Sequence, residues 1–171
     1  RAATSSFLAR TLLRNTMSID DDIALLQSGP VLDLLGRDAL RILAIGAESR
    51  TMQRGAVLFT AGEPSDGAFV VEAGSLLLRT PGGGEMIARR GAVLGEYELF
   101  VETPRPMTAM AREFSSVMRI PRALFLKMLD GFPDVAERLR QWLLGQTDQI
   151  ADEIETVRRA LDSQRDLATR E

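Results

Sequence analysis

Short apolar runs separated by turn-forming residues are the feature that most constrains the fold of this chain. The runs lie at residues 57–59, 69–71, 76–78, 86–88, 107–111 and 117–120. Glycine, proline and acidic residues separate several of them, as in residues 62–67 and 81–84. Strands this short, at this spacing, predict an antiparallel roll, sandwich or barrel. We interpret the glycine run at 82–84 as a hairpin tip, because no Lys-Ser/Thr pair follows it as in a phosphate loop.

Helical periodicity flanks this β region on both sides. Apolar residues recur at helical spacing over residues 20–49, where Gly29-Pro30 and Gly36 mark breaks between helices. Residues 122–129 indicate a short helix, residues 131–133 a joint, and the residues from Asp134 onward a long helix. We therefore predict a lead-in segment at residues 1–19, a β domain with flanking helices at 20–131, and a long C-terminal helix at 132–171.

A heptad pattern runs along the last part of the predicted long helix. Its seam consists of Ile150, Ile154, Val157, Leu161 and Ala168, with Gln164 at the remaining position. Apolar residues at this spacing are typical of a coiled coil. We predict a homodimer formed through this helix. A helix that packs against its own domain is the alternative.

The absence of cysteine and histidine excludes several classes of function. Disulfides, thiolate catalysis, iron–sulfur clusters, histidine-ligated metals and Ser-His or Cys-His nucleophile pairs all need one of these residues. We therefore predict no metal site, no cofactor and no catalytic residue. The net charge of −3 gives no support to a nucleic-acid-binding surface.

The first residues leave the origin of the chain open. Residues 1–17 contain three arginines and no acidic residue. They can be the lead-in from an upstream region, an amphipathic targeting segment or a remnant of expression, and Met17 can also be the true start. No apolar run approaches the roughly 18 to 20 residues that span a bilayer, so we expect a cytoplasmic protein.

The stretch LGEYELFVETPRPMTA, residues 94–109, carries the chemistry of a candidate ligand site. A Gly-Glu pair begins a predicted helical turn, and a Pro-Arg pair stands where the chain returns to a strand. Backbone N–H groups and Arg105 can bind phosphate oxygens, since a guanidinium is a two-pronged, charge-assisted donor. Glu96 accepts hydrogen bonds and suits a sugar hydroxyl. The motif therefore predicts a site for a small anionic sugar phosphate.

Two separate segments resemble the cyclic nucleotide-binding domain family, which includes the catabolite activator protein, protein kinase A regulatory subunits and cyclic-nucleotide-gated channels. Residues 54–79, RGAVLFTAGEPSDGAFVVEAGSLLLR, are similar to the first half of that domain. Residues 94–111 are similar to its phosphate-binding cassette. The resemblance extends over about residues 20–142. It implies a jelly-roll-like antiparallel β-roll, or double-stranded β-helix, with N-terminal helices and a long C-terminal helix.

The resemblance also implies a set of ligand-binding residues. Glu96 is expected to bond the ribose 2′-hydroxyl, Arg105 to pair with the cyclic phosphate, and Leu99 to anchor the cassette helix. The complete set is Gly95, Glu96, Tyr97, Leu99, Arg105, Pro106, Met107 and Thr108. Ligand binding in this family draws the helix after the roll inward, so we expect a hinge at residues 130–133. The base cap would come from Arg138, Gln141 or Trp142, although Trp142 can equally be a core residue.

Three positions depart from the family pattern. Pro106 has no backbone N–H to offer the phosphate. Glu98 replaces a small residue beside the pocket and would oppose the phosphate if it points inward, and Met107 also stands where a small residue is common. In this family, preference for guanine often uses a hydroxyl just after the arginine, and Pro106 supplies none, so the resemblance favours cAMP over cGMP. A domain that keeps the roll but has lost the nucleotide is the alternative.

We therefore predict a non-enzymatic regulatory module that binds a cyclic nucleotide and relays binding to its C-terminal helix. The main rival is a ligand-free dimerisation or interaction module. An enzyme such as a sugar-processing cupin is disfavoured, because cupins hold their metal through histidines. A third possibility is the tail of a membrane channel, with residues 1–17 as the end of its linker. No particular effector domain or partner protein is indicated.

Overall fold

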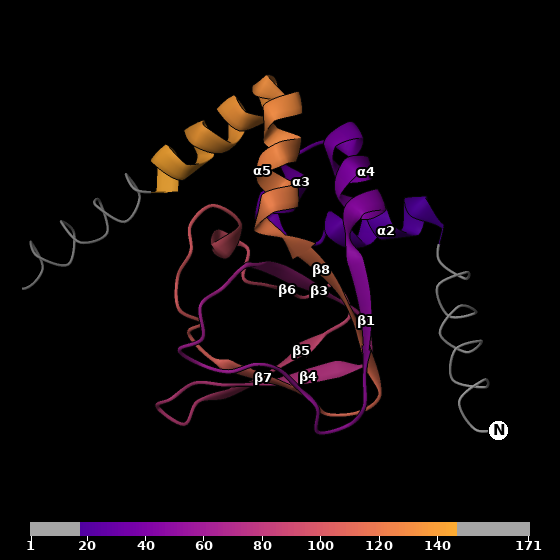
Figure 1. Ribbon diagram of the computed structural model, residues 1–171, viewed down its shortest axis with the longest axis vertical. Coiled ribbons are helices and arrows are strands. Elements are labelled where there is room, and N and C mark those ends of the chain that lie inside the picture. Colours follow the sequence, from indigo (N-terminus) through magenta and orange to yellow (C-terminus); the bar gives the residue numbers. More distant parts are fainter. Residues whose placement is uncertain (1–17, 147–171) are drawn as a thin grey trace, which may run out of the picture. The chain divides into compact units, whose positions relative to one another are not determined.

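The structure, a computed structural model, describes residues 18–146 and consists of two four-stranded antiparallel sheets with helices at one end (Figure 1). The first sheet has the order β1-β8-β3-β6 and the second β2-β7-β4-β5. The strands are β1 (Glu48–Met52), β2 (Val57–Phe59), β3 (Gly67–Ala73), β4 (Ser75–Arg79), β5 (Glu85–Arg89), β6 (Val93–Leu94), β7 (Thr108–Ala111) and β8 (Ser115–Pro121). This arrangement confirms the predicted β-roll.

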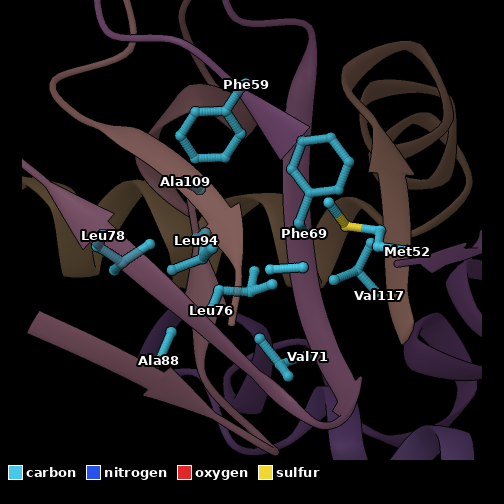
Figure 2. Close-up of a cluster of buried hydrophobic side chains, with 11 residues drawn as sticks. Met52, Phe59, Phe69, Val71, Leu76, Leu78, Ala88, Leu94, Ala109 and Val117 are labelled. Atoms are coloured by element: carbon cyan, nitrogen blue, oxygen red, sulfur yellow. The ribbon is translucent and has the colours of Figure 1, made fainter. Parts of the chain in front are cut away.

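The core of the roll lies between the two sheets (Figure 2). Strand β3 is buried in all but its last residue, because β8 and β6 pair with its two edges. Phe59 of β2 and Phe69 of β3 meet with their ring centroids 5.8 Å apart. The cluster consists of Met52, Phe59, Phe69, Val71, Leu76, Leu78, Ala88, Leu94, Ala109, Ala111 and Val117. It accounts for most of the short apolar runs seen in the sequence.

Gly67 lets β3 begin at very close range to β8. Its φ is +152°, and a Cβ at this position would overlap the carbonyl oxygen of Ile120 and lie 3.0 Å from the backbone nitrogen of Arg122. Since backbone atoms cannot move aside as a side-chain end can, any larger residue here would displace one of the strands. The close approach fixes the position of the Gly67 carbonyl, which faces the candidate site described below.

Four helices lie at one end of the roll: α2 (Ile19–Leu26), α3 (Pro30–Asp33), α4 (Arg37–Gly46) and α5 (Arg122–Gly131) (Figure 1). Ser18 and Asp21 form a capping box at the start of α2. Helix α4 packs against α2 and α5, and Leu40, Leu43 and Phe125 are fully buried there. Burial of this kind stabilises a short helix more than its propensity does.

The prediction of helix over residues 20–49 is wrong at its C-terminal end. Helix α4 ends at Gly46, and β1 begins at Glu48. Four of the five β1 residues are exposed, and the strand has a polar sequence, ESRTM. It forms through pairing with β8 rather than through burial of its own side chains. Strand β6 has two residues and was likewise absent from the predicted runs.

A single non-helical residue, Phe132, separates helix α5 from the next helical segment. Phe132 has φ −133° and ψ 72°, and residues 133–146 are helical again. The joint therefore falls within the predicted hinge at 130–133.

The chain divides into two compact units after Val135, and the predicted domain boundaries at 19/20 and 131/132 stay predictions. The heptad seam at 150–168 and the segment 1–17 lie outside the described residues. Across residues 18–146, no helix has the length and apolar character needed to cross a membrane.

Glu72 on β3 is expected to make stability depend on pH. The residue is 7% exposed, and Ser49 Oγ donates to its Oε1 at 2.7 Å. Burial raises the pKa of Glu72 above its usual 4.5, and the Ser49 hydrogen bond opposes that shift. Because the folded-state pKa is raised, protonation stabilises the folded chain as the pH falls through that value toward 4.5.

We therefore expect wild type to gain stability relative to Glu72→Gln as the pH is lowered from 7 to 5. Urea denaturation of both proteins at each pH measures this difference, and shared titrating groups cancel in the comparison. Glu102→Gln, at an exposed carboxylate, is the control. A difference between wild type and Glu72→Gln that stays constant, or moves the other way, contradicts the expectation.

Candidate functional site

The Gly-Glu pair forms the turn that joins β6 to a short 3-10 helix. Gly95 has φ +79°, and Glu96 precedes η1 (Tyr97–Leu99). Leu99 is fully buried, and the next residue, Phe100, packs edge-on against Phe125 of α5 with ring centroids 5.3 Å apart. The helical turn predicted after the Gly-Glu pair is present, and buried side chains fix it to the roll and to α5.

Arg105 is buried at the centre of the candidate site. The residue is 4% exposed, and its Nη2 donates to the Gly67 carbonyl at 2.8 Å. Its guanidinium carbon lies 4.5 Å from the ring centroid of Phe59 and 5.4 Å from that of Phe69. A guanidinium over an aromatic face is attracted by the ring quadrupole, more strongly when water is excluded. These contacts hold the side chain in one place without a ligand.

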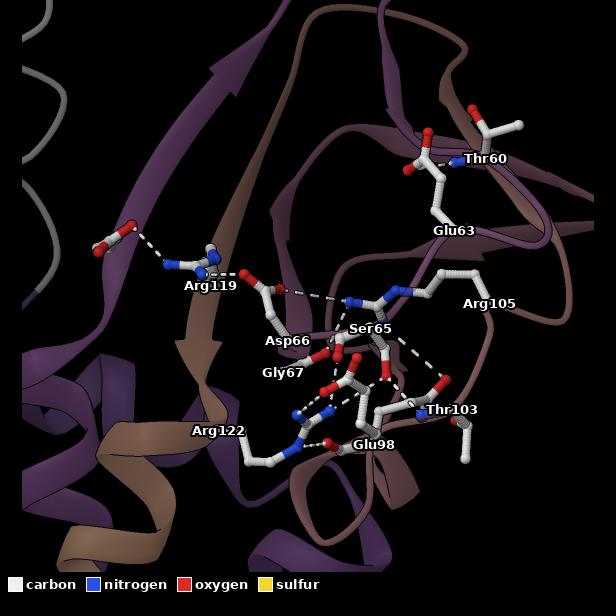
Figure 3. A network of polar contacts seen from close by, with 12 residues as sticks. Thr60, Glu63, Ser65, Asp66, Gly67, Glu98, Thr103, Arg105, Arg119 and Arg122 are labelled. Carbon is white, nitrogen blue, oxygen red and sulfur yellow. Dashed lines mark hydrogen bonds and ion pairs between the residues drawn. The ribbon is translucent and has the colours of Figure 1, made fainter.

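Two carboxylates lie close to the Arg105 guanidinium (Figure 3). Glu98 Oε1 is 3.8 Å from Nη1, and Asp66 Oδ1 is 3.9 Å from Nη2. Both distances exceed the hydrogen-bonding range, so these are ion pairs without hydrogen bonds. Burial lowers the pKa of Arg105, and the charges of Glu98 and Asp66 oppose that shift. Among the buried side-chain nitrogens and oxygens of residues 18–146, Arg105 Nη1 alone has no hydrogen-bond partner.

Asp66 connects Arg105 to the β1–β8 edge of the first sheet. Arg119 of β8 donates through Nη2 to Asp66 Oδ2 and through Nη1 to Glu48 Oε2, the second at 3.1 Å. Figure 3 shows Asp66 between Arg119 and Arg105. Although partial burial raises the pKa of Asp66, the hydrogen bond and charge of Arg119 and the charge of Arg105 leave it below its usual value. The site arginine is therefore part of a chain of alternating charges.

Glu96 accepts two backbone hydrogen bonds at the start of α3. The N–H groups of Val31 and Leu32 donate to its Oε1 at 2.8 and 3.1 Å. Burial raises the pKa of Glu96, whereas the hydrogen bonds from Leu32 and Val31 lower it. Gly29 leaves room for this carboxylate, because a Cβ there would overlap Glu96 Oε1 and lie 2.8 Å from Val93 Cγ2.

An open pocket of about 440 Å³ lies over the cassette. Its lining consists of Val93, Gly95, Glu96, Tyr97, Glu98, Thr103, Pro104 and Pro106. Arg105 does not line it, but Gly95 does, and a Cβ on Gly95 would overlap Arg105 Nη1. The unpartnered nitrogen therefore lies next to Gly95, which is one of the residues that line the pocket.

The remaining predicted residues take different positions. Tyr97 is 60% exposed at the pocket wall. Met107 packs half-buried against the core cluster of the roll, and Thr108 Oγ1 accepts from the Ala61 N–H at 3.0 Å. The structure thus brings Gly95, Glu96, Tyr97 and Pro106 together at the pocket, with Met107 packed against the core.

The predicted base-cap residues lie on the helical segment 133–146, in the second compact unit. In that segment Gln141 Nε2 donates to Glu137 Oε1 at 2.7 Å, and Arg140 bonds both oxygens of Glu137 at 3.0 Å. The role of Arg138, Gln141 and Trp142 as a cap stays a prediction.

Several residues around Arg105 were not predicted. Asp66 and Gly67 belong to the segment 62–67, whose sequence indicated a turn and no ligand chemistry. An acid placed directly before a strand-opening glycine is the signal that could have identified Asp66. Phe59 lies in the apolar run 57–59, and in the structure it belongs to the core cluster and also stacks its ring against Arg105. The backbone donors to Glu96 have no sequence signal of their own.

Known proteins match this chain over the roll. The family model described as cyclic nucleotide-binding domain matches residues 49–132. A cyclic nucleotide-gated potassium channel from Mesorhizobium japonicum is 32% identical over 115 residues, which are 67% of this chain and 32% of the channel. The chain therefore spans about a third of the length of that curated relative.

Two solved structures share the architecture. A cyclic nucleotide-binding-like protein from Brucella abortus is 31% identical with a TM-score of 0.59, and the match covers 64% of this chain and 98% of that one. The N-terminal domain of a transcriptional regulator from Streptomyces coelicolor is 24% identical with a TM-score of 0.67, and the match covers 76% and 94% of the two chains. The second match supports the fold alone.

Proposed function

The chain belongs to the cyclic nucleotide-binding domain family, and from this membership we propose that it is a regulatory module that binds a cyclic nucleotide, cAMP in preference to cGMP. The family is regulatory rather than catalytic, and we propose no enzymatic activity for this chain. The ligand would occupy the pocket between Gly95 and Pro106, with its cyclic phosphate directed at Arg105.

The unpartnered Nη1 of Arg105 is the observation that supports this function best. A buried N–H without an acceptor costs roughly 1–3 kcal/mol, and more when the group is charged. The atom adjoins Gly95 in the pocket wall, where a phosphate oxygen could accept from it in a charge-assisted hydrogen bond. A cyclic phosphate would therefore supply the hydrogen-bond acceptor that the protein itself does not offer to Nη1.

Glu98 limits the affinity of the proposed site. Its carboxylate lies 3.8 Å from Arg105 Nη1, and its side chain is 10% exposed. A phosphate must therefore compete with Glu98 for the same guanidinium and approach a second negative charge. Pro106 removes a backbone donor at the same place. We expect affinity at the weak end of what a buried arginine can provide.

The preference for cAMP rests on the residues that follow the arginine. Pro106 supplies no hydroxyl and no N–H. The next hydroxyl along the chain, on Thr108, accepts a hydrogen bond from the Ala61 N–H. No side-chain hydroxyl therefore follows Arg105 directly, where it could bind the guanine amino group.

A mechanical link supports the proposed relay from the cassette to α5. Arg122, the first residue of α5, donates through Nε to the Glu98 carbonyl at 2.8 Å and through Nη2 to the Ser65 carbonyl at 2.6 Å. Phe100 packs against Phe125 on the same helix. A shift of Glu98 away from Arg105 would move the backbone that holds α5. Dimerisation through residues 132–171, a cytoplasmic location and an effector, either a domain of the same polypeptide or a separate protein, are further parts of this proposal.

A ligand-free interaction module is the second candidate. Glu98 and Asp66 already neutralise Arg105, and Glu96 is bonded to α3. Both predicted ligand-reading side chains therefore have partners in the protein itself. In this reading the polar network only holds the roll and its helices together.

Thermal denaturation with three nucleotides separates the two candidates. Ligand at 100 times its Kd stabilises a protein by about 2.7 kcal/mol, which for a chain of this size raises Tm by about 5–10 °C. We expect such a rise with millimolar cAMP, a smaller rise with cGMP and none with linear 5′-AMP. Equal curves with and without cAMP would favour the ligand-free module.

A further inference from the structure

Glu96 is a pocket-lining residue whose carboxylate has one oxygen bonded to another part of the protein. Oε1 accepts from the N–H groups of both Val31 and Leu32, and Glu96 is part of the pocket lining. The two donors come from a segment 64 and 65 residues away in the sequence. The N-terminal helices therefore determine where a pocket carboxylate points.

We propose that Gly29 and the backbone amides of Val31 and Leu32 position Glu96 for ligand recognition, so that discrimination of the ribose 2′-hydroxyl depends on the α3 segment. The inference rests on the proposed function, since it concerns the same pocket. Gly29, Val31 and Leu32 are positioning residues, because they act through Glu96 and do not contact the nucleotide.

Retention of both amide bonds in the ligand-bound state follows from hydrogen-bond energetics. If Glu96 left α3 to reach a hydroxyl, two half-buried N–H groups would lose their acceptor, which is costly for each of them. A carboxylate has about four acceptor sites on its two oxygens. Oε1 can keep Val31 and Leu32 while Oε2 accepts from the ligand. Bonds from α3 to Oε1 and a bond from the ligand to Oε2 are therefore compatible.

Gly29 makes this arrangement sensitive to a single methyl group. A Cβ at residue 29 would overlap Glu96 Oε1 and crowd Val93 Cγ2 at 2.8 Å. Both are side-chain rather than backbone atoms, and Glu96 Oε1 is the end of a flexible side chain. Gly29 has φ −90°, so alanine is compatible with the backbone. Gly29→Ala is therefore expected to fold and to push the Glu96 carboxylate out of its position.

The test compares cAMP with 2′-deoxy-cAMP by calorimetric titration. A hydroxyl-to-carboxylate bond predicts that wild type prefers cAMP by about tenfold, and that Gly29→Ala reduces this ratio to about twofold. If Val93 moved instead of Glu96, binding of both nucleotides would weaken equally, and the ratio of the two affinities would not change. Glu96→Gln, which keeps the side-chain size, should also lower the ratio.

Gly82→Ala is the matched control, since a Cβ there meets nothing within 4 Å, and it should keep the wild-type ratio. If wild type binds cAMP and Gly29→Ala keeps the tenfold preference for cAMP over 2′-deoxy-cAMP, the inference is wrong but the proposed function stands. Equal affinities of wild type for the two nucleotides also overturn it. Wild type that binds neither nucleotide overturns the proposed function together with the inference.

Discussion

Arg105→Ala is expected to weaken cAMP binding at least about 100-fold, because charge-assisted bonds to a phosphate are the strongest polar contacts that the site offers. The guanidinium is buried and held by Gly67, Phe59 and Phe69, so it loses little freedom when it binds. Alanine removes the positive charge and leaves Glu98 facing the phosphate. Calorimetric titration of both proteins with cAMP measures the difference.

Arg105→Lys and Arg79→Ala distinguish the roles of charge and geometry. Lysine keeps the charge but loses the planar, two-pronged donor, so we expect an intermediate loss. Arg79 pairs with Glu85 on the exposed β4–β5 hairpin, and its replacement should leave affinity unchanged. Thermal denaturation of Arg105→Ala checks that the roll remains folded. Unaltered cAMP affinity in a folded Arg105→Ala protein contradicts the proposed phosphate site.

Glu98→Gln is expected to strengthen cAMP binding by about tenfold. Two unit charges about 4 Å apart interact by about 4 kcal/mol at an effective dielectric of 20, and a fraction of this repulsion is enough for a tenfold change. Glutamine keeps the size of the side chain but no longer competes with the phosphate for Arg105. The change should appear mainly in the Kd measured by titration, and it should depend only weakly on salt because Glu98 is buried.

Glu102→Gln is the matched control for this gain. Glu102 lies in the same loop, is 66% exposed at its side chain and pairs with Arg122 at 3.7 Å. Removal of its charge changes the net charge of the chain by the same amount as Glu98→Gln, without touching Arg105. We expect less than a twofold effect, as for an exposed ion pair. Equal gains in Glu98→Gln and Glu102→Gln would mean that net charge matters and that the Glu98–Arg105 pair does not.

The sequence predicts most of the roll because its strands are buried on one face. Phe69, Val71, Leu76 and Leu78 form part of the core cluster that the apolar runs indicated. Strand β1 escaped prediction because it depends on pairing with β8, and its exposed residues carry no apolar signal. Strand β6 is too short for any pattern. Pairing between distant segments is a tertiary property, whereas alternation and turns are local ones.

The candidate site was predictable as a motif but not as a network. Gly95 and Arg105 stand ten residues apart in a recognisable stretch, and the structure brings them into contact. Sequence reasoning could state that a buried arginine needs a partner, but it could not choose Asp66 or the Gly67 carbonyl. The bonds from Val31 and Leu32 to Glu96 come from backbone N–H groups, which every non-proline residue has.

Calorimetric titration of nucleotide-free wild-type protein with cAMP tests the central claim most directly. We predict saturable binding of one nucleotide per chain, with an affinity that Glu98→Gln increases and Arg105→Ala abolishes. No heat at millimolar cAMP, for wild type and Glu98→Gln alike, would contradict the claim. The Arg105 network would then be part of a structural module.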